Sequence, residues 1–514
     1  MPHLANLMPN YVTASIALSF GGFLNGYDTG CIGAIVHMEQ FSAALGDLSA
    51  TVRGITVSMI LLTGIFPSLF AGQLADKHGR LRVILPGAAL FGLGALLQAT
   101  SFSLGQFIFG RAVSGIGQGA FLANIAVYLT EIAPSRRRGR LAALPQFMST
   151  LGICLGYFSC YTTSSLKDSM AWRLPYIVMV AVSLMLALVC RALPESPRWL
   201  LLWGRTSDAM AALELLDFDM DEARRDFLST PQEQPSLSAR QNFLLPFRGP
   251  YRSRTLLALF ILSMVQLSGI DAITYYAPAL FDQAGISHSN SSLVASGVSS
   301  ITMLVISIPA FMLADKWGRR TSAISGGVFL SGIMVLIGSL YAAGSVGSTG
   351  AARWVVVVSV FAFGMAYCAT WGVVGKIYAS EILPGNTRAA GNSIGMASCF
   401  PSVDFSKFTN WLVALITPIL LSASAYGAYF LFGALTVFTV VVLALFMPET
   451  RGRSLENIQS EFRRPVFNNI VGSLCLPGVH RRTATSQETS EAPIELGSRS
   501  HEPSAMASSS GIAA

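Results

Sequence analysis

The chain has 514 residues, of which 52% are hydrophobic and only 12% are charged. Because a soluble domain carries roughly 25% charged residues, this composition excludes an ordinary water-soluble globular protein. The formal net charge of +7 indicates basic loops on one side of a membrane rather than a nucleic-acid partner.

Apolar stretches of about 20 residues, each long enough to cross a bilayer, recur along the chain. Backbone polar groups find no water inside a bilayer, so these stretches must be helices. The sequence predicts an all-α membrane protein with about twelve transmembrane helices in two six-helix halves. The expected helices are, in chain order, 11–37, 53–75, 83–101, 107–129, 141–161, 175–191, 255–281, 293–314, 322–343, 353–378, 388–422 and 426–447.

Polar segments divide this series into four expected parts. Residues 1–192 form a first six-helix bundle, whose opening helix remains as a signal anchor because no cleavage site follows it. Residues 193–253 are a cytoplasmic linker with short interfacial helices, and residues 254–447 form a second bundle. The Ser-rich residues 448–514 are expected to be a cytoplasmic, largely disordered tail.

Basic residues gather in alternate loops, at 77–82, 136–140 and 316–320 and at Arg388. The opposite loops 102–106, 282–292 and 422–426 contain no Lys or Arg. The positive-inside rule therefore predicts that the basic loops and both termini are cytoplasmic, in a multi-pass protein of the plasma membrane. Asn290 in Asn-Ser-Ser is then an expected external glycosylation site.

Three motifs of the first half return in the same order in the second half. Residues 74–80, Leu-Ala-Asp-Lys-His-Gly-Arg, recur at 313–319 with Trp in place of His, an offset of 239. The Tyr-x-x-Glu-Ile motif at Tyr128 recurs at Tyr378, and Pro-Glu at 194 recurs at 448, offsets of 250 and 254. The order and near-constant offset indicate a duplicated six-helix unit, as in transporters that rock two halves about a central site.

No pattern indicates an enzyme. The seven cysteines lack the paired spacing of a metal or redox site and are interpreted as small apolar residues. The run from Gly115 to Gly119 looks like a dinucleotide loop, but it follows a helical pattern, so close helix packing explains it better. We therefore expect no enzymatic activity, no metal and no cofactor.

Together these motifs resemble the sugar porter family of the major facilitator superfamily. The resemblance runs from about residue 20 to residue 455. It rests on the two Asp-x-x-Gly-Arg loops, Gly110-Arg111, the Glu381 loop and the runs Gly-Tyr-Asp-Thr-Gly at 26–30, Pro-Glu-Ser-Pro-Arg-Trp at 194–199 and Gln-Leu-Ser-Gly-Ile at 266–270. It implies uptake of a sugar or polyol by alternating access, either facilitated or proton-coupled.

Charged residues stand at the expected cytoplasmic helix ends of both halves. Opposite charges there can bridge the bundles in one state and separate in the other, which would form a latch of the outward-facing state. Ordinary loop charge is the alternative, but the positive-inside rule explains the bases and not the repeated acids. The expected latch residues are Asp76, Arg80, Glu131, Arg138, Glu195 and Arg198, then Asp315, Arg319, Glu381 and Arg388, with Glu449 near the end of the second half.

Asp28 lies inside an otherwise apolar first helix. A carboxylate within the bilayer is costly and is by default a functional candidate. Arg111, near the start of the fourth helix, is its natural partner. The resemblance assigns this pair to proton coupling, and a static buried ion pair is the alternative.

The substrate cavity is expected to be lined from both halves by amides and aromatic rings. An amide donates and accepts hydrogen bonds together, which suits sugar hydroxyls. By resemblance the substrate-binding candidates are Gln146, Gln266, Asp271, Trp371 and Asn410, and the outer gate is Tyr275 with Tyr276. For a single glutamine, bonding between helices is the alternative role.

The sequence departs from the family pattern at several cavity positions. Asn25 stands where the family usually has an aromatic residue, and Val265 stands where it has the first of two glutamines. Met303, in the eighth helix, stands where the family usually has an asparagine. Asp271 replaces a usual asparagine and Lys376 replaces a usual tryptophan. These two replacements place opposite charges in one expected cavity. The hypothesis is that these two charges pair and that Lys376 also holds a substrate carboxylate, which would shift the substrate from a neutral hexose toward a sugar acid. The alternative is that Lys376 extends toward the cytoplasmic edge.

The eleventh helix is also unusual, because Arg388 and Asn410 are farther apart than in the family. The additional residues, near 400–407, include Pro401, Asp404 and Lys407, which do not suit an uninterrupted span. Either this helix starts near Phe408, or the additional residues are a retained intron.

These observations predict a carrier of a hexose-like sugar or polyol by alternating access with proton symport. Its expected partners are a sugar-like small molecule, protons and the lipid bilayer, and no nucleic acid. The alternatives are a carrier of a sugar acid or other anionic polyol, and a nutrient sensor that does not transport.

Overall fold

In the computed structural model the described residues are 10–134, 137–218, 252–286, 289–313, 318–347, 350–382 and 395–449. Across these ranges the secondary structure is helical, with no strand. Eleven helices in them are long and apolar enough to span a membrane. The first span is divided into two shorter helices, so the prediction of about twelve spans in an all-α protein is confirmed.

The helices of the first half are joined by short loops, and several begin at a side-chain cap. Asn10, for example, accepts hydrogen bonds from the backbone N–H groups of Val12 and Thr13 at 3.0 Å. These helices are α2 (Tyr11–Leu18), α3 (Phe20–Ile35), α4 (Glu39–Leu45), α5 (Ala50–His78), α6 (Leu81–Ala99), α7 (Leu104–Glu131), α8 (Arg138–Ala142), α9 (Leu144–Thr163) and α10 (Met170–Ala192). Two short helices, α11 (Pro197–Leu202) and α12 (Thr206–Leu215), follow in the segment expected to be the linker.

The second half repeats this pattern with two interrupted spans. Gly269 separates α15 from α16 with φ +94°, a left-handed conformation that glycine adopts without steric cost. Thr370 separates α19 from α20. The helices are α15 (Arg252–Leu267), α16 (Ile270–Gln283), α17 (Ser289–Leu313), α18 (Arg319–Ala342), α19 (Ala351–Ala369), α20 (Trp371–Ile382), α22 (Gly395–Ala423) and α23 (Gly427–Phe446).

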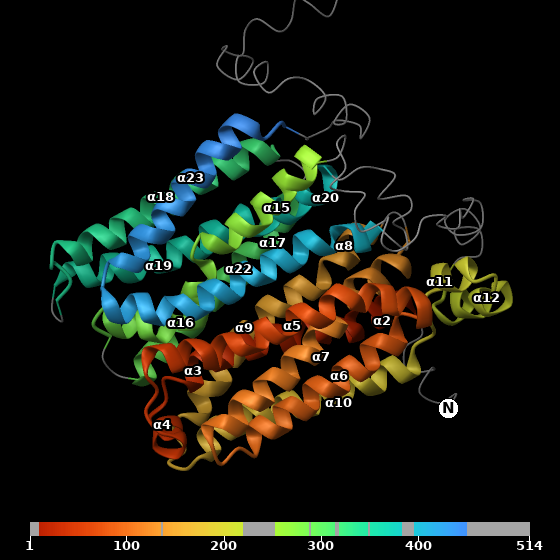
Figure 1. Cartoon of the computed structure of the whole chain (residues 1–514), viewed down its shortest axis with the longest axis horizontal. Coiled ribbons are helices and arrows are strands. Elements are labelled where there is room, and N and C mark those ends of the chain that lie inside the picture. Colours follow the sequence, from red (N-terminus) through yellow and green to blue (C-terminus); the bar gives the residue numbers. More distant parts are fainter. Residues whose placement is uncertain are drawn as a thin grey trace, which may run out of the picture. The chain divides into compact units, whose positions relative to one another are not determined.

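Helices of the first half (α2–α10) pack mainly on one another, and so do those of the second half (α15–α23). In Figure 1 the red-to-yellow helices and the green-to-blue helices accordingly form two groups. Small residues permit the tightest contact, between α3 and α9. A Cβ atom on Gly26 would lie 1.8 Å from the carbonyl oxygen of Ser149, so only glycine fits there.

Among the described helices, the most extensive contacts between the halves are those of α3 with α16, α5 with α22, and α9 with α17. Their closest approaches put Gly33 against the carbonyl oxygen of Tyr275 and Gly54 against that of Leu415. These points lie near the end of α3 and the start of α5, far from the bundle end that carries Arg80. We call the end with Arg80 the basic end, and the end with Gly33 and Gly54 the opposite end.

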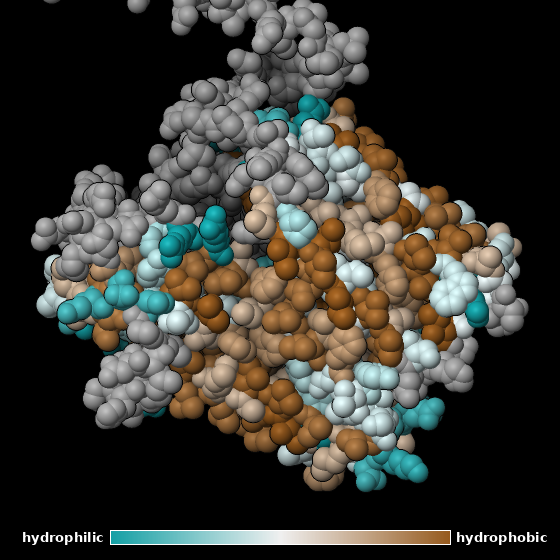
Figure 2. All heavy atoms as spheres, turned by 180° about the vertical axis from the view of Figure 1, so that it is seen from behind, coloured by the Kyte–Doolittle hydropathy of each residue, from teal (hydrophilic) through white to brown (hydrophobic). Residues whose placement is uncertain are grey.

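Large apolar side chains remain exposed along the spans, among them Phe70, Leu188, Val358 and Phe438. Figure 2 shows such residues as broad brown areas between more polar patches. An apolar exterior of this kind is the surface that membrane-spanning helices present to lipid.

Helix α22 differs from the expectation of a late start. It is helical from Gly395, through Pro401, so the helix itself begins before Phe408, the start that one of the two alternatives gave. Its window of apolar character nevertheless begins only at Ser406. The helix is therefore longer than its apolar part, and the polar residues before Ser406 precede the part suited to the bilayer.

Candidate functional site

The predicted pair of Asp28 on α3 and Arg111 on α7 forms in the structure. Arg111 Nη1 lies 2.6 Å from Asp28 Oδ1, and the two side chains are 0% and 4% exposed, respectively. Arg111 also donates from Nε to the carbonyl oxygen of Thr56 at 3.2 Å and from Nη2 to that of Val57 at 2.8 Å. The pair thus links α3, α7 and α5 in a site without water access.

The two contacts to α5 are a part of the site that the sequence did not indicate. Backbone carbonyl groups belong to every residue, so Thr56 and Val57 carry no signal of this role. Their carbonyl oxygens accept hydrogen bonds from the Nε and Nη2 groups of Arg111, which do not bind Asp28. The guanidinium group therefore keeps hydrogen-bond partners when the charge on Asp28 changes.

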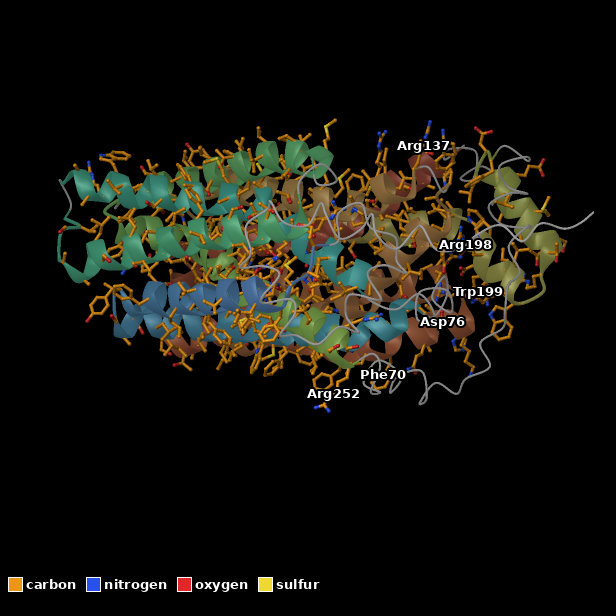
Figure 3. The ribbon with its side chains drawn as sticks, turned by 90° about the horizontal axis from the view of Figure 1, so that it is seen from above. Phe70, Asp76, Arg137, Arg198, Trp199 and Arg252 are labelled. Carbon is orange, nitrogen blue, oxygen red and sulfur yellow. The ribbon has the colours of Figure 1, made fainter. Side chains whose placement is uncertain are left out.

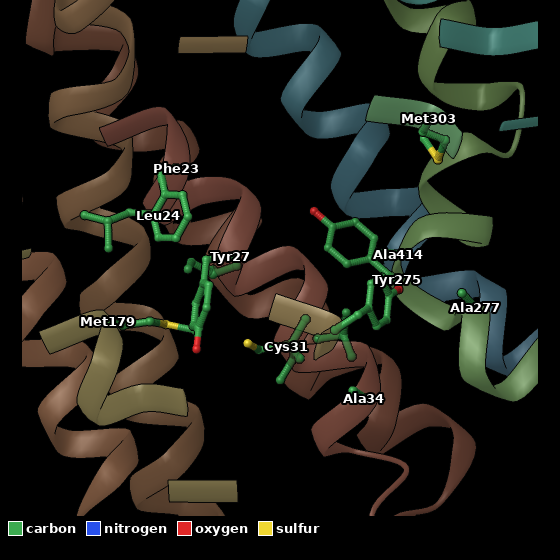
Figure 4. Packing of buried hydrophobic residues seen from close by; sticks show 14 of the residues in the cluster. Phe23, Leu24, Tyr27, Cys31, Ala34, Met179, Tyr275, Ala277, Met303 and Ala414 are labelled. Atoms are coloured by element: carbon green, nitrogen blue, oxygen red, sulfur yellow. The ribbon is translucent and has the colours of Figure 1, made fainter. Parts of the chain in front are cut away.

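Tyr275 and Tyr276, the predicted gate, lie where the halves meet at the opposite end. Both are buried. Tyr276 interrupts α16 with φ −117° and ψ 20°, and its hydroxyl group donates to the carbonyl oxygen of Ala414 at 2.6 Å. Tyr157 of α9 donates to the carbonyl oxygen of Thr274. Figure 4 shows the buried side chains from Tyr27 to Tyr275 and Ala414 that fill this region.

The same end carries a contact between a histidine and a carboxylate that the sequence reasoning missed. His37 Nε2, just beyond α3, lies 3.7 Å from Asp282 Oδ2 on α16. Burial lowers the pKa of His37, and Asp282 opposes this effect. The charge of one loop histidine gives no sequence signal of a partner 245 residues away.

The polar substrate-binding candidates come from both halves. Gln146 on α9 is exposed, and its position on the helix face that leads to Tyr157 directs it toward the second half. Gln266, Asp271 and Asn410 are half-buried. The Oδ1 atom of Asn410 is buried and accepts no hydrogen bond from the described residues. An unused acceptor of this kind is what a ligand hydroxyl group needs.

Asp271 interacts electrostatically with two tyrosines, Tyr275 and Tyr367. Trp371, in contrast, is buried and donates its indole N–H to the carbonyl oxygen of Ala323 on α18 at 2.8 Å. Its polar atom is thus occupied in packing between helices. The side chain of Lys376 lies outside the described residues, so its pairing with Asp271 remains a prediction.

At the basic end, three of the expected latch residues of the first half, Asp76, Arg80 and Glu131, form a network. Arg80 donates to Glu131 from Nη2 at 3.0 Å and from Nε at 3.3 Å, and it also binds Asp76. Arg80 and Glu131 are both buried. These bonds join helices of the first half to one another. A bridge from this network to the second half remains a prediction.

The short helix α11 closes over this network. Trp199 donates its indole N–H to the carbonyl oxygen of Asp76 at 2.8 Å, which satisfies one of the last carbonyl groups of α5. Arg198 beside it is buried. Figure 3 shows Asp76, Arg198 and Trp199 at the same end of the molecule. The linker motif thus fixes the end of the second span.

The repeated motifs make equivalent contacts in the two halves. Glu195 accepts from the backbone N–H groups of Leu81 and Arg82 at 3.3 Å. Glu449 accepts from those of Arg319 and Arg320 at 2.8 and 3.0 Å. Each glutamate therefore caps the start of a helix, where backbone donors are unpaired and the helix dipole favours negative charge.

Two further contacts repeat with them. Tyr128 donates to the carbonyl oxygen of Pro194 at 2.7 Å, and Tyr378 donates to that of Pro448 at 3.3 Å. Burial raises the pKa of Glu195, and the backbone N–H groups oppose this effect. A Cβ atom on Gly79, which has φ +110°, would lie 2.6 Å from Glu195, so the glycine of the loop motif makes room for the cap.

Several predicted site residues lie outside what the structure describes. Asp315 and Arg388 are in undescribed segments, and so are the side chains of Arg138, Glu381 and Asn290. Asn290 itself is in the first turn of α17. The latch in the second half and the glycosylation site remain predictions.

The fold and the buried pair define a class: a polytopic α-helical membrane transporter, made of two related halves, with charged and polar groups between apolar spans. The chain matches the family described as "Sugar (and other) transporter" over residues 14–462. It belongs to this family, the sugar porters of the major facilitator superfamily. It is therefore a transporter and not an enzyme, as the sequence predicted.

Relatives of known type support this assignment. The glucose transporter GlcP of Staphylococcus epidermidis is 30% identical, over 87% of this chain and 96% of its own. The probable polyol transporter 6 of Arabidopsis thaliana is 30% identical, over 88% and 94%. The arabinose-proton symporter of Bacillus subtilis is 27% identical, over 87% and 94%.

The fold is also that of a solved transporter. The inward open conformation of the xylose transporter XylE from E. coli matches with a TM-score of 0.71 and 21% identity, over 88% of this chain and 99% of that one. This likeness confirms the predicted fold class.

Proposed function

We propose that this chain carries a neutral hexose-like sugar or a polyol together with protons, and that Asp28 is the proton-carrying group. The observation that carries the proposal is the burial of the Asp28–Arg111 pair inside spanning helices. Relatives that include a glucose transporter, a polyol transporter and a proton symporter support the substrate class and the coupling.

The proposed cycle depends on the charge of Asp28. When Asp28 is ionised, it holds Arg111, and α3 stays joined to α7 and α5. Protonation removes this attraction, while the carbonyl groups of Thr56 and Val57 retain the guanidinium group. The change in pairing shifts the equilibrium between two arrangements of the halves, which is how a bound proton alters access to a substrate site.

The substrate is proposed to bind between the halves, on Gln146 from the first half and on Gln266, Asp271 and Asn410 from the second. The contacts at Gly33, Gly54 and Tyr276 close the opposite end. We place the basic end in the cytoplasm of a cell whose plasma membrane holds the protein, as the positive-inside rule favours. Thiol labelling of single cysteines placed at Lys77 and at Ser103, in intact cells, tests this orientation.

A second experiment, which compares uptake of neutral and acidic sugars by two variants, distinguishes a neutral substrate from an acidic one. A neutral substrate predicts that Lys376→Gln and Asp271→Asn variants change affinity without changing the preference for neutral over acidic sugars. A sugar-acid carrier predicts that Lys376→Gln alone abolishes uptake of the acid, because the anion loses its cation.

Uptake of radiolabelled glucose, xylose and sorbitol into cells without their own hexose uptake tests the main proposal. We expect uptake that accumulates substrate and stops with a protonophore. The Asp28→Asn variant is expected to equilibrate substrate without accumulating it. Absence of uptake for every neutral sugar and polyol, with the protein present at the surface, would refute the proposal and favour a sensor.

A further inference from the structure

A cluster of three neutral polar side chains lies beside the Asp28–Arg111 pair and is used by neither the pair nor the gate. Asn25 of α3 donates from Nδ2 to the Ser149 hydroxyl group of α9 at 3.1 Å. Gln118 of α7 donates from Nε2 to Asn25 Oδ1. Three helices of the first half therefore meet in one hydrogen-bonded cluster.

The cluster lies on the side of α3 that faces the second half. From Gly21 to Val36, the only residues of α3 that are not buried are Asn25 and Thr29, one turn apart. The next positions on this face are Gly33, which contacts Tyr275 of α16, and His37, which contacts Asp282. The accessible part of α3 is thus the part that looks toward the second half.

The cluster retains unused hydrogen-bonding capacity. Asn25 Nδ2 has two hydrogens, and Ser149 takes one. The Oε1 atom of Gln118 accepts no bond from the described residues, and it is not among their fully buried unpaired atoms. One donor and one acceptor, on adjacent amides, are therefore accessible to a small polar molecule.

We infer that Asn25 and Gln118 form a hydroxyl-binding subsite in the first half, which takes two hydroxyl groups on neighbouring carbons of a neutral substrate. One hydroxyl accepts from Asn25 Nδ2, and the other donates to Gln118 Oε1. Ser149 holds Asn25 in place and is a positioning residue. The inference rests on the proposed function and adds a specificity-determining pair to it.

The subsite also lies close to the proposed proton site. Asn25 precedes Asp28 by three residues on α3, and Gln118 follows Arg111 by seven residues on α7. Both intervals bring side chains to one face of a helix, so the two hydrogen-bonded pairs are stacked along the same α3–α7 contact. A substrate bound on the amides therefore binds directly beside the helices whose pairing the proton changes.

The experiment measures selectivity with the full chain in proteoliposomes, by counterflow without a proton gradient. The probes are glucose and its monodeoxy analogues. In the unaltered protein, removing a hydroxyl that the subsite binds is expected to raise KM about fivefold. In Asn25→Leu and Gln118→Leu, glucose is expected to show the same rise, and the penalty for the deoxy analogue is expected to disappear.

Two further variants keep the test decisive. Gln98→Leu removes an amide that is buried between α6 and α7, where it bonds Ser114 and the Gly94 carbonyl group, and it is expected to keep the full penalty. Asn25→Ser keeps a small polar group and is expected to fold even if Asn25→Leu does not, and to reduce the penalty. KM ratios are independent of how much protein folds.

Unchanged penalties in Asn25→Ser and Gln118→Leu, or their equal loss in Gln98→Leu, would overturn the subsite and leave the proposed function intact. If the unaltered protein itself transports neither glucose nor any analogue, the proposed function fails, and the subsite fails with it.

Discussion

The two halves share their structure at the basic end and differ in their centres. In both, a glutamate after a proline caps the start of the third span, and a tyrosine bonds the carbonyl group of that proline. In the centre, Asp28 of the first half is bound by Arg111. The first span of the second half also contains a carboxylate, Asp271, which has the tyrosines Tyr275 and Tyr367 as neighbours.

This difference separates what duplication preserved from what function changed. The caps satisfy backbone groups that every such helix end exposes, so both copies need them. A buried carboxylate is retained only where it is paired or used. One half therefore contains the group suited to titrate against a cation, and the other contains a carboxylate suited to accept hydrogen bonds from hydroxyl groups.

The largest expected effect breaks this comparison at the centre. Asp28→Asn should abolish accumulation against a gradient, because an amide cannot release a proton, while Asp271→Asn should retain accumulation with altered affinity. Removing the charged partner of Arg111 should also lower the free energy of unfolding by roughly 3 kcal/mol. Uptake with and without a protonophore, together with thermal melting in detergent, measures both. Equal loss of accumulation in the two variants would contradict the assignment of coupling to the first half.

The second prediction concerns the buried charges of the basic end. Arg80→Gln should destabilise the protein by about 3–5 kcal/mol, because Glu131 would stay buried without its cation. Arg205→Gln is the matched control, since Arg205 and Asp208 form an exposed pair at the start of α12. Melting temperatures of the purified variants decide the matter. A shift as small for Arg80→Gln as for the control would show that the network contributes little.

The third prediction sharpens the likeness of the halves. Glu195→Gln and Glu449→Gln should each lower stability by about 1 kcal/mol, because each weakens two hydrogen bonds at a helix start. Similar melting shifts are expected from both. A large effect from one alone would mean that the repeated motif has a different role in that half.

The smallest expected effect is pH dependence at the opposite end. In the closed arrangement burial lowers the pKa of His37, with Arg53 acting in the same direction and Asp282 against it. Separation of the halves would expose His37 and return its pKa toward about 6.5, so protonation favours the open arrangement. Lowering the pH through about 6.5 should therefore weaken the closed state roughly twofold.

Labelling of a Thr274→Cys variant from the opposite end measures this opening. The rate should rise on acidification, and the rise should be absent when His37→Gln is added. Slower labelling at low pH would mean that attraction between protonated His37 and Asp282 outweighs the cost of burying the charge.

The spans were predictable because they follow from local apolar composition, and the repeat was predictable because its motifs recur in a fixed order. The Asp28–Arg111 pair was also predictable, since a charge inside an apolar helix requires a partner of opposite charge. Trp371 was less so. The family resemblance suggested that Trp371 lines the cavity, whereas its indole N–H donates to the carbonyl oxygen of Ala323. A side chain that faces either a cavity or a neighbouring helix looks the same in one sequence.

The sequence by itself determined the membrane-spanning architecture, the duplication and the family, because hydrophobic length, alternating basic loops and repeated motifs do not depend on how helices pack. Apart from the Asp28–Arg111 pair, only the tertiary structure decided which polar groups meet. The contacts of Arg111 with Thr56 and Val57, the pairing of His37 with Asp282 and the cluster of Asn25, Gln118 and Ser149 all join helices distant in sequence. Their physical cause is the close approach of helix backbones at glycines, which brings particular faces together.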